Sequence, residues 1–85
     1  MMKFFEQWDK LENCKAKVLL KHSLFGRQLH NCDSLRIIND GRIGLVIKGQ
    51  EIFVDKAEIV FAEVTNKMYT VSDGRLSITL IVNKM

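Results

Sequence analysis

The chain has 85 residues, of which 47% are hydrophobic and 27% are charged, and it contains no proline. This length allows one domain with one core, and the composition excludes an intrinsically disordered chain. No apolar run reaches the ~18–20 residues that a membrane-spanning helix needs. The N-terminal residues also lack the pattern of a signal peptide. We therefore expect a single domain, 1–85, that resides in the cytoplasm and does not associate with a membrane.

The net charge of +3 is unevenly distributed along the chain. Residues 14–28 contain four cations and no acid, whereas residues 51–65 contain four acids and one cation. Such polarity suits the binding of a polyanion, and it equally suits association between copies through complementary faces. An ordinary solvated surface is the third interpretation.

Apolar residues recur at helical spacing near the N-terminus, at Phe4, Phe5, Trp8 and Leu11. This pattern predicts one amphipathic helix within residues 1–13. Asn13 is expected to end it, because asparagine tolerates the left-handed conformation that follows a helix. So short a helix is marginal in isolation, so Phe4 and Trp8 should dock on the rest of the molecule.

From residue 15 onward the apolar period changes from 3.6 to 2, which predicts β-strands. Asp-Gly pairs at 40–41 and 73–74 favour tight hairpin turns with positive φ angles. Further turns are expected at 26–27, 48–51 and 66–67. The predicted strands lie at 16–24, 29–38, 43–47, 52–54, 59–64, 68–71 and 76–82. The fold class is therefore mainly β with one N-terminal helix, as a small antiparallel barrel or sandwich.

Four residues form a candidate metal set: Cys14, His22, His30 and Cys32. Thiolates and imidazoles are preferred ligands of zinc, but the set contains no C-x-x-C or H-x₃-H spacing. A Cys32–His30 pair on one strand would also lack a third group to orient the base for nucleophilic catalysis. We interpret these residues as free thiols and strand histidines, and we expect no metal, cofactor, small-molecule substrate or enzymatic activity.

Cations provide the stronger functional signal, and five are candidate nucleic-acid contacts: Lys15, Lys17, Lys21, Arg27 and Arg36. The three lysines alternate along the first predicted strand, and a cationic stripe on a sheet can contact phosphates without sequence preference. Phe25, Phe53 and Tyr69 would stack on bases if they were exposed. The alternative is that Phe53 is core and that the lysines keep an edge strand soluble.

Three stretches resemble the Sm-like family, which includes the bacterial Hfq type and the Sm-like domains of ribosome maturation factors. The first is the helix at 4–11 leading into Lys17–Lys21. The second is Leu29–Ile38, which resembles the long bent second strand of the family, with Asp33 partway. The third is Ile47–Ile52, similar to the hydrophobic–basic–Gly–x–x–hydrophobic motif near the family's RNA pocket.

This resemblance implies a strongly bent barrel over residues 15–64, with residues 66–83 as an extra C-terminal hairpin. It also implies RNA as a partner and a homo-oligomer formed by pairing edge strands. Ile37 stands where the family usually has asparagine, so phosphate contacts are expected instead of a uridine pocket. The alternative function is a structural or protein-interaction module that self-associates through edge strands and charged faces. A second similarity, over residues 42–80, is to small sheet-rich spore-formation proteins of the YabP type.

Overall fold

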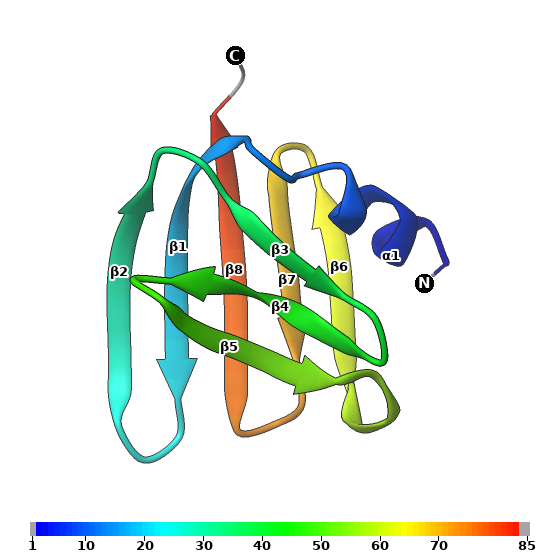
Figure 1. Cartoon of the computed structure of the whole chain (residues 1–85). Helices are drawn as coiled ribbons and strands as arrows, with labels where there is room; N and C mark the ends of the chain where they lie inside the picture. Colours follow the sequence, from blue (N-terminus) through cyan, green and yellow to red (C-terminus); the bar gives the residue numbers. More distant parts are fainter. Residues whose placement is uncertain (1, 84–85) are drawn as a thin grey trace.

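The computed structural model describes residues 2–83 of the chain. Within them are one helix, α1 (Met2–Asp9), and a 3-10 turn, η1 (Lys56–Glu58). The strands are β1 (Lys15–His22), β2 (Gly26–Cys32), β3 (Arg36–Asn39), β4 (Arg42–Ile47), β5 (Gln50–Asp55), β6 (Phe61–Thr65), β7 (Met68–Ser72) and β8 (Leu76–Asn83). All pairings are antiparallel, in a large sheet ordered β2-β1-β8-β7-β6 and a small sheet ordered β3-β4-β5 (Figure 1).

Helix α1 docks on the sheets through the two aromatic residues that its pattern predicts. Phe4 and Trp8 are buried in the common core, and the indole Nε1 of Trp8 donates to the carbonyl oxygen of Gly44, 3.1 Å away. The helix ends at Asp9, four residues before the end predicted at Asn13, and residues 10–13 form turns. Asn13 has a φ of 71°, which confirms the left-handed conformation expected there.

The core lies between the two sheets, as period-2 alternation requires. On β1, Ala16, Val18 and Leu20 point inward, whereas the lysines point outward. Ile43 and Leu45 on β4 supply the facing layer from the small sheet, and both are fully buried. Burial of these alternating side chains is the main force holding the sheets together.

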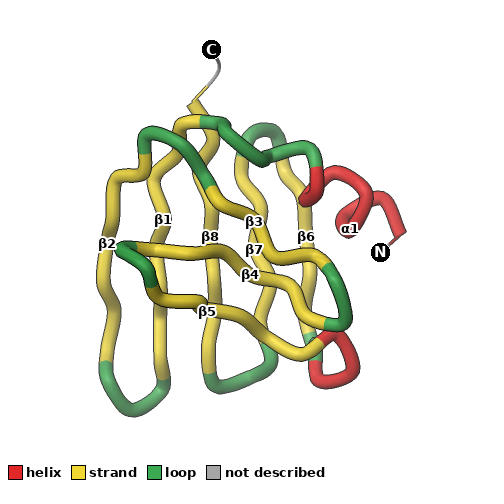
Figure 2. The backbone as a smooth tube through the Cα atoms, viewed as in Figure 1, coloured by secondary structure: helices red, strands yellow, loops and turns green. Residues whose placement is uncertain are grey.

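The expected barrel is not confirmed, because the strands form two sheets that are not joined into one. The strand predicted at 29–38 is split between β2 in the large sheet and β3 in the small sheet (Figure 2). Between them Leu35 is buried in the core. Its amide donates to the carbonyl of Cys14, and its carbonyl accepts from the amide of Asn13, both at 2.9 Å. These hydrogen bonds fix residues 33–35, where the chain crosses from the large sheet to the small sheet. The mainly β class with one short helix is confirmed.

The C-terminal hairpin is not an addition to the sheet but its centre. Strand β8 pairs with β1 on one side and with β7 on the other. Val71, Ile78 and Leu80 of this hairpin are all 0% exposed. The reason is that the chain leaves the small sheet after β5, passes through η1 and returns to the large sheet as β6, which places β7 and β8 between β6 and β1.

Turns with left-handed residues lie partly where the sequence predicts them. Gly74 of the second Asp-Gly pair has a φ of 94°. The first Asp-Gly pair, at 40–41, forms its turn without a left-handed residue. In this turn the amide of Asp40 donates to the carbonyl of Arg42 at 3.1 Å. Lys48 and Gly49 instead have φ of 51° and 81°, the pair of positive values that a two-residue type I′ hairpin requires.

Candidate nucleic-acid interface

Four of the five predicted cations lie together on the outer face of the large sheet. Lys15, Lys17 and Lys21 occupy outward positions of β1, where the pattern of exposure alternates with burial. Arg27 on β2 is directly opposite Lys21, and antiparallel partners project from the same face. We call these four residues the basic face.

Acidic side chains are absent from the outward positions of the four strands nearest the basic face. The strand registers place Leu29 and Asn31 of β2 and Ser77, Thr79 and Ile81 of β8 on this side. Through β8, the register places Met68, Thr70 and Ser72 of β7 there too. Among the described residues of this sheet, the acid on the same face is Glu63 of β6, three strands from β1 and therefore about 14 Å away. The cations are thus not neutralised within their own face.

Arg36 does not join the basic face. It lies on β3 of the small sheet, and its Nε is 3.8 Å from a carboxylate oxygen of Glu12. The sequence placed Arg36 on the same long strand as Leu29, but the break at residues 33–35 moves it to another layer. It is therefore separated from the other four candidates.

The three aromatic candidates lie away from the basic face. Phe25 is 80% exposed at the tip of the β1–β2 hairpin, but its ring centre lies 4.7 Å from that of His22, an inward position of β1. It also lines a pocket with Leu20 and Gln28 on the inner side of the sheet. Tyr69 is half-buried, and its hydroxyl donates to the Oε1 of Gln7 at 3.2 Å. Phe53 lies in the small sheet beneath the guanidinium of Arg42, whose Cζ is 4.6 Å from the ring centre. Phe53 is 40% exposed, so it is not a core residue.

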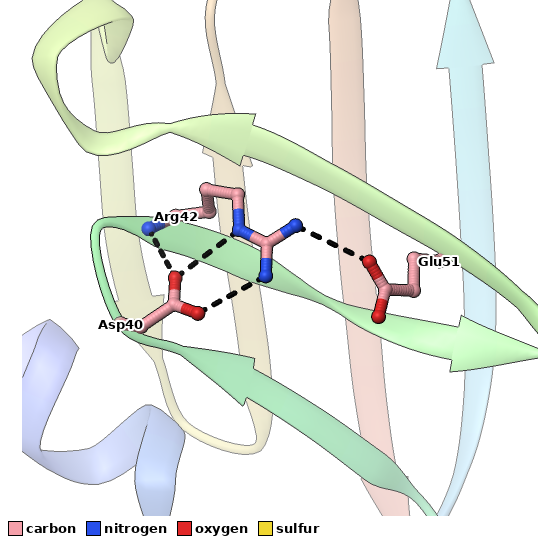
Figure 3. A network of polar contacts seen from close by, with 3 residues as sticks. All are labelled: Asp40, Arg42 and Glu51. Atoms are coloured by element: carbon pink, nitrogen blue, oxygen red, sulfur yellow. Dashed lines mark hydrogen bonds and ion pairs between the residues drawn. The ribbon is translucent and has the colours of Figure 1, made fainter.

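The outer face of the small sheet carries a compact ion-pair network that the sequence analysis did not predict (Figure 3). The guanidinium of Arg42 donates to Asp40, with 3.0 Å between Nη2 and Oδ2, and to Glu51, with 3.2 Å between Nη1 and Oε1. The hydrogen bond from the Arg42 side chain is the main cause that lowers the pKa of Asp40. The same pairing raises the pKa of Arg42. Two of the acids of this face are thus already paired within the molecule.

A groove of about 600 Å³ lies between the end of β2 and the β4–β5 turn. Its walls include His30, Cys32 and Asp33 on one side and Arg36 and Lys48 on the other. Partial burial, and then the charge of Asp33, raise the pKa of the Cys32 thiol, which therefore stays protonated at neutral pH. The sequence signal for this groove is that two of the stretches resembling the Sm-like family, 29–38 and 47–52, meet here.

The cysteines and histidines of the candidate metal set do not converge. Cys14 directly precedes β1 and His22 ends it, so about 26 Å of extended chain separates them. Within residues 2–83, no three side chains of His, Cys, Asp or Glu are grouped so as to hold a metal ion. Cys14 and Cys32 are free thiols.

Comparison of the chain with protein-family models, with curated proteins and with solved structures found no match. The described residues contain no helix that is long and apolar enough to cross a membrane.

Proposed function

We propose that the protein is a non-catalytic RNA-binding module that contacts phosphates through its basic face. The observation that carries this proposal is the gathering of Lys15, Lys17, Lys21 and Arg27 on one open sheet surface, where the outward positions of β2, β1, β8 and β7 hold no acid. A positively charged sheet surface can follow the backbone of a single-stranded nucleic acid.

The likeness to the Sm-like family is part of this proposal. It is supported by the short helix ahead of an antiparallel meander and by the groove in which the 29–38 and 47–52 stretches meet. The division into two sheets departs from the bent barrel of that family. The contacts that we propose therefore lie on the open face rather than in a base-specific pocket.

The test is fluorescence anisotropy with labelled oligo-U and oligo-A at several salt concentrations. Contacts from three or four cations to a single strand give a slope of about −2 to −3 for log K against log salt. Lys17→Glu with Lys21→Glu should lower affinity by about tenfold or more, because two phosphate contacts become repulsive.

The matched control reverses two cations beside the groove, Arg36→Glu with Lys48→Glu, which changes the net charge equally. This control should retain most of the affinity. Absence of binding at low salt, or a larger loss in the control than in the basic-face variant, would count against the proposal.

A second candidate function is a structural module that associates with other copies of itself. The observation that favours it is the edge of the large sheet at β2, which pairs with β1 alone among the strands of residues 2–83. Pairing of complementary charged faces is less favoured, because Asp40 and Glu51 on the small sheet are already paired with Arg42.

A further inference from the structure

The four edges of the two sheets differ in how well they are covered. The β3 edge is closed by α1 and by Glu12, whose Oε1 accepts from the amide of Ile37 at 2.7 Å. The β6 edge also packs against α1. The β5 edge carries the acids Glu51 and Asp55. Charges and covering elements of this kind are how proteins stop edge strands from pairing with other chains.

Strand β2 lacks these protections over its whole length. It pairs continuously with β1 from Gly26 to Cys32, with no bulge to twist the edge away. It contains no proline and only one charged residue, Arg27. Leu29, at its midpoint, is 61% exposed, and its partner Leu19 extends the apolar surface into the sheet. An exposed edge of this kind is a template for another strand.

We propose that β2 pairs antiparallel with β2 of a second copy, about a twofold axis at Leu29. The inference rests on the second candidate function above and gives it a definite interface. Leu29 is the midpoint of the seven-residue strand, so only this register pairs all seven residues. A symmetric dimer needs a self-complementary surface, which an antiparallel edge pair supplies.

Side chains across this register are compatible in size and charge. Leu29 faces Leu29 of the partner subunit, which joins the two Leu19–Leu29 pairs into one apolar strip. Arg27 faces the partner's Asn31, so no like charges are directly opposed. The diagonal neighbour of Arg27 is the partner's Asp33, which follows the strand and provides an opposite charge twice by symmetry.

The dimer joins the two large sheets edge to edge and places both basic faces on the same side. A nucleic-acid strand crossing the axis would then meet the lysines of both copies, six instead of three, with each Arg27 beside the partner's Asp33. This arrangement predicts a dimer and not the six- or seven-membered ring of the resembled family.

Sedimentation equilibrium of the full chain without nucleic acid tests the assembly. We expect a mass of twice 9.8 kDa that falls to 9.8 kDa on dilution. Leu29→Asp places two carboxylates face to face and should give a monomer. Val60→Asp, at an apolar residue that is 71% exposed outside β2, should remain dimeric. A native monomer at all concentrations, or an assembly that survives Leu29→Asp, overturns the proposal.

Disulfide trapping tests the register in a Cys14→Ala/Cys32→Ala background. Leu29→Cys should form a covalent dimer under mild oxidation, because the two residues meet on the axis. Gln28→Cys should not, because it faces the partner's His30 and lies too far from its own symmetry mate. Equal trapping of both variants, or none with Leu29→Cys, contradicts the register.

Failure of the dimer and failure of nucleic-acid binding give separate results. Leu29→Asp keeps all four basic-face cations, so a monomer of this variant should still bind oligonucleotides. Its binding should be weaker, because the new carboxylate lies on the same side of the sheet as these cations. If the native protein is a dimer that does not bind oligonucleotides, the nucleic-acid proposal is refuted and the proposed interface stands.

Discussion

At the scale of the residue, Gly44 leaves no room for a side chain between strands β4 and β5. Gly44 accepts the indole hydrogen bond of Trp8 through its carbonyl oxygen. A β-carbon at Gly44 would overlap the carbonyl oxygen of Ile52 and the backbone of Phe53 on the neighbouring strand. Because the obstacle is backbone, it cannot be relieved by a change of rotamer. Glycine is needed at this position for space and not for backbone conformation.

Gly44→Ala should therefore lower the free energy of unfolding by roughly 3 kcal/mol, at the upper end of overpacking costs. Gly41→Ala is the control, since nothing lies within 4 Å of an added β-carbon there and its φ is not positive. The control should be neutral or stabilising by up to about 1 kcal/mol, because alanine restricts the unfolded chain. Urea denaturation measures both, and equal midpoints for the two variants would refute the packing argument.

At the scale of the element, the β7–β8 turn depends on one carboxylate. Oδ1 of Asp73 accepts from the amides of Arg75 and Leu76, at 2.9 and 2.8 Å. Partial burial acts to raise the pKa of Asp73, but the amides of Leu76 and Arg75, with the charge of Arg75, together lower it. The folded state thus prefers the ionised carboxylate.

A lowered pKa in the folded state adds stability above the unfolded pKa of about 4, and this stability is lost as the pH falls below that value. Asp73→Ala should cost about 1 kcal/mol at pH 7, since both amides lose their acceptor. Asp73→Asn keeps an acceptor oxygen and should cost less. The difference between wild type and either variant should shrink between pH 5 and pH 3 in urea denaturation. A difference that does not change with pH would show that the charge of Asp73 does not contribute.

Elements were predictable wherever a local pattern determines them. The outward positions of Lys15, Lys17 and Lys21 follow from strict alternation along β1, and Arg27 follows from the hairpin register. Arg36 was misplaced because the turn-forming pair Asp33-Ser34 was interpreted as part of one long strand. The chain crosses there because Leu35 is buried and bonded to residues 13 and 14, contacts that are remote in sequence.

At the scale of the whole molecule, the last two strands are structural rather than peripheral. Strand β8 joins the β1–β2 hairpin to the β6–β7 hairpin, and its inward side chains are in the core. In the sequence, the three strands of the small sheet lie between β2 and β6. In space, the small sheet covers large-sheet strands that come from both ends of the chain (Figure 1).

A chain that ends at residue 65 should therefore fail to fold, although the resemblance to an Sm-like barrel over 15–64 predicts a stable domain. Without β7 and β8, β1 loses one partner and the core loses Val71, Ile78 and Leu80. Amide dispersion in a two-dimensional NMR spectrum, or a cooperative unfolding transition, measures the outcome. A folded 1–65 chain would mean that the small sheet and β1–β2 can form a core by themselves.

The sequence by itself determined the helix, the positions of most turns and the face on which each strand residue lies, because these depend on side-chain period and local turn chemistry. The tertiary structure alone decided that the strands divide into two sheets, that β8 is central, and that Arg36 is separated from the other cations. These outcomes depend on pairings between residues far apart in the chain, such as β1 with β8, for which no local pattern specifies the partner. Strand order is chosen by which combination buries all apolar faces at once, and that is a property of the assembled core.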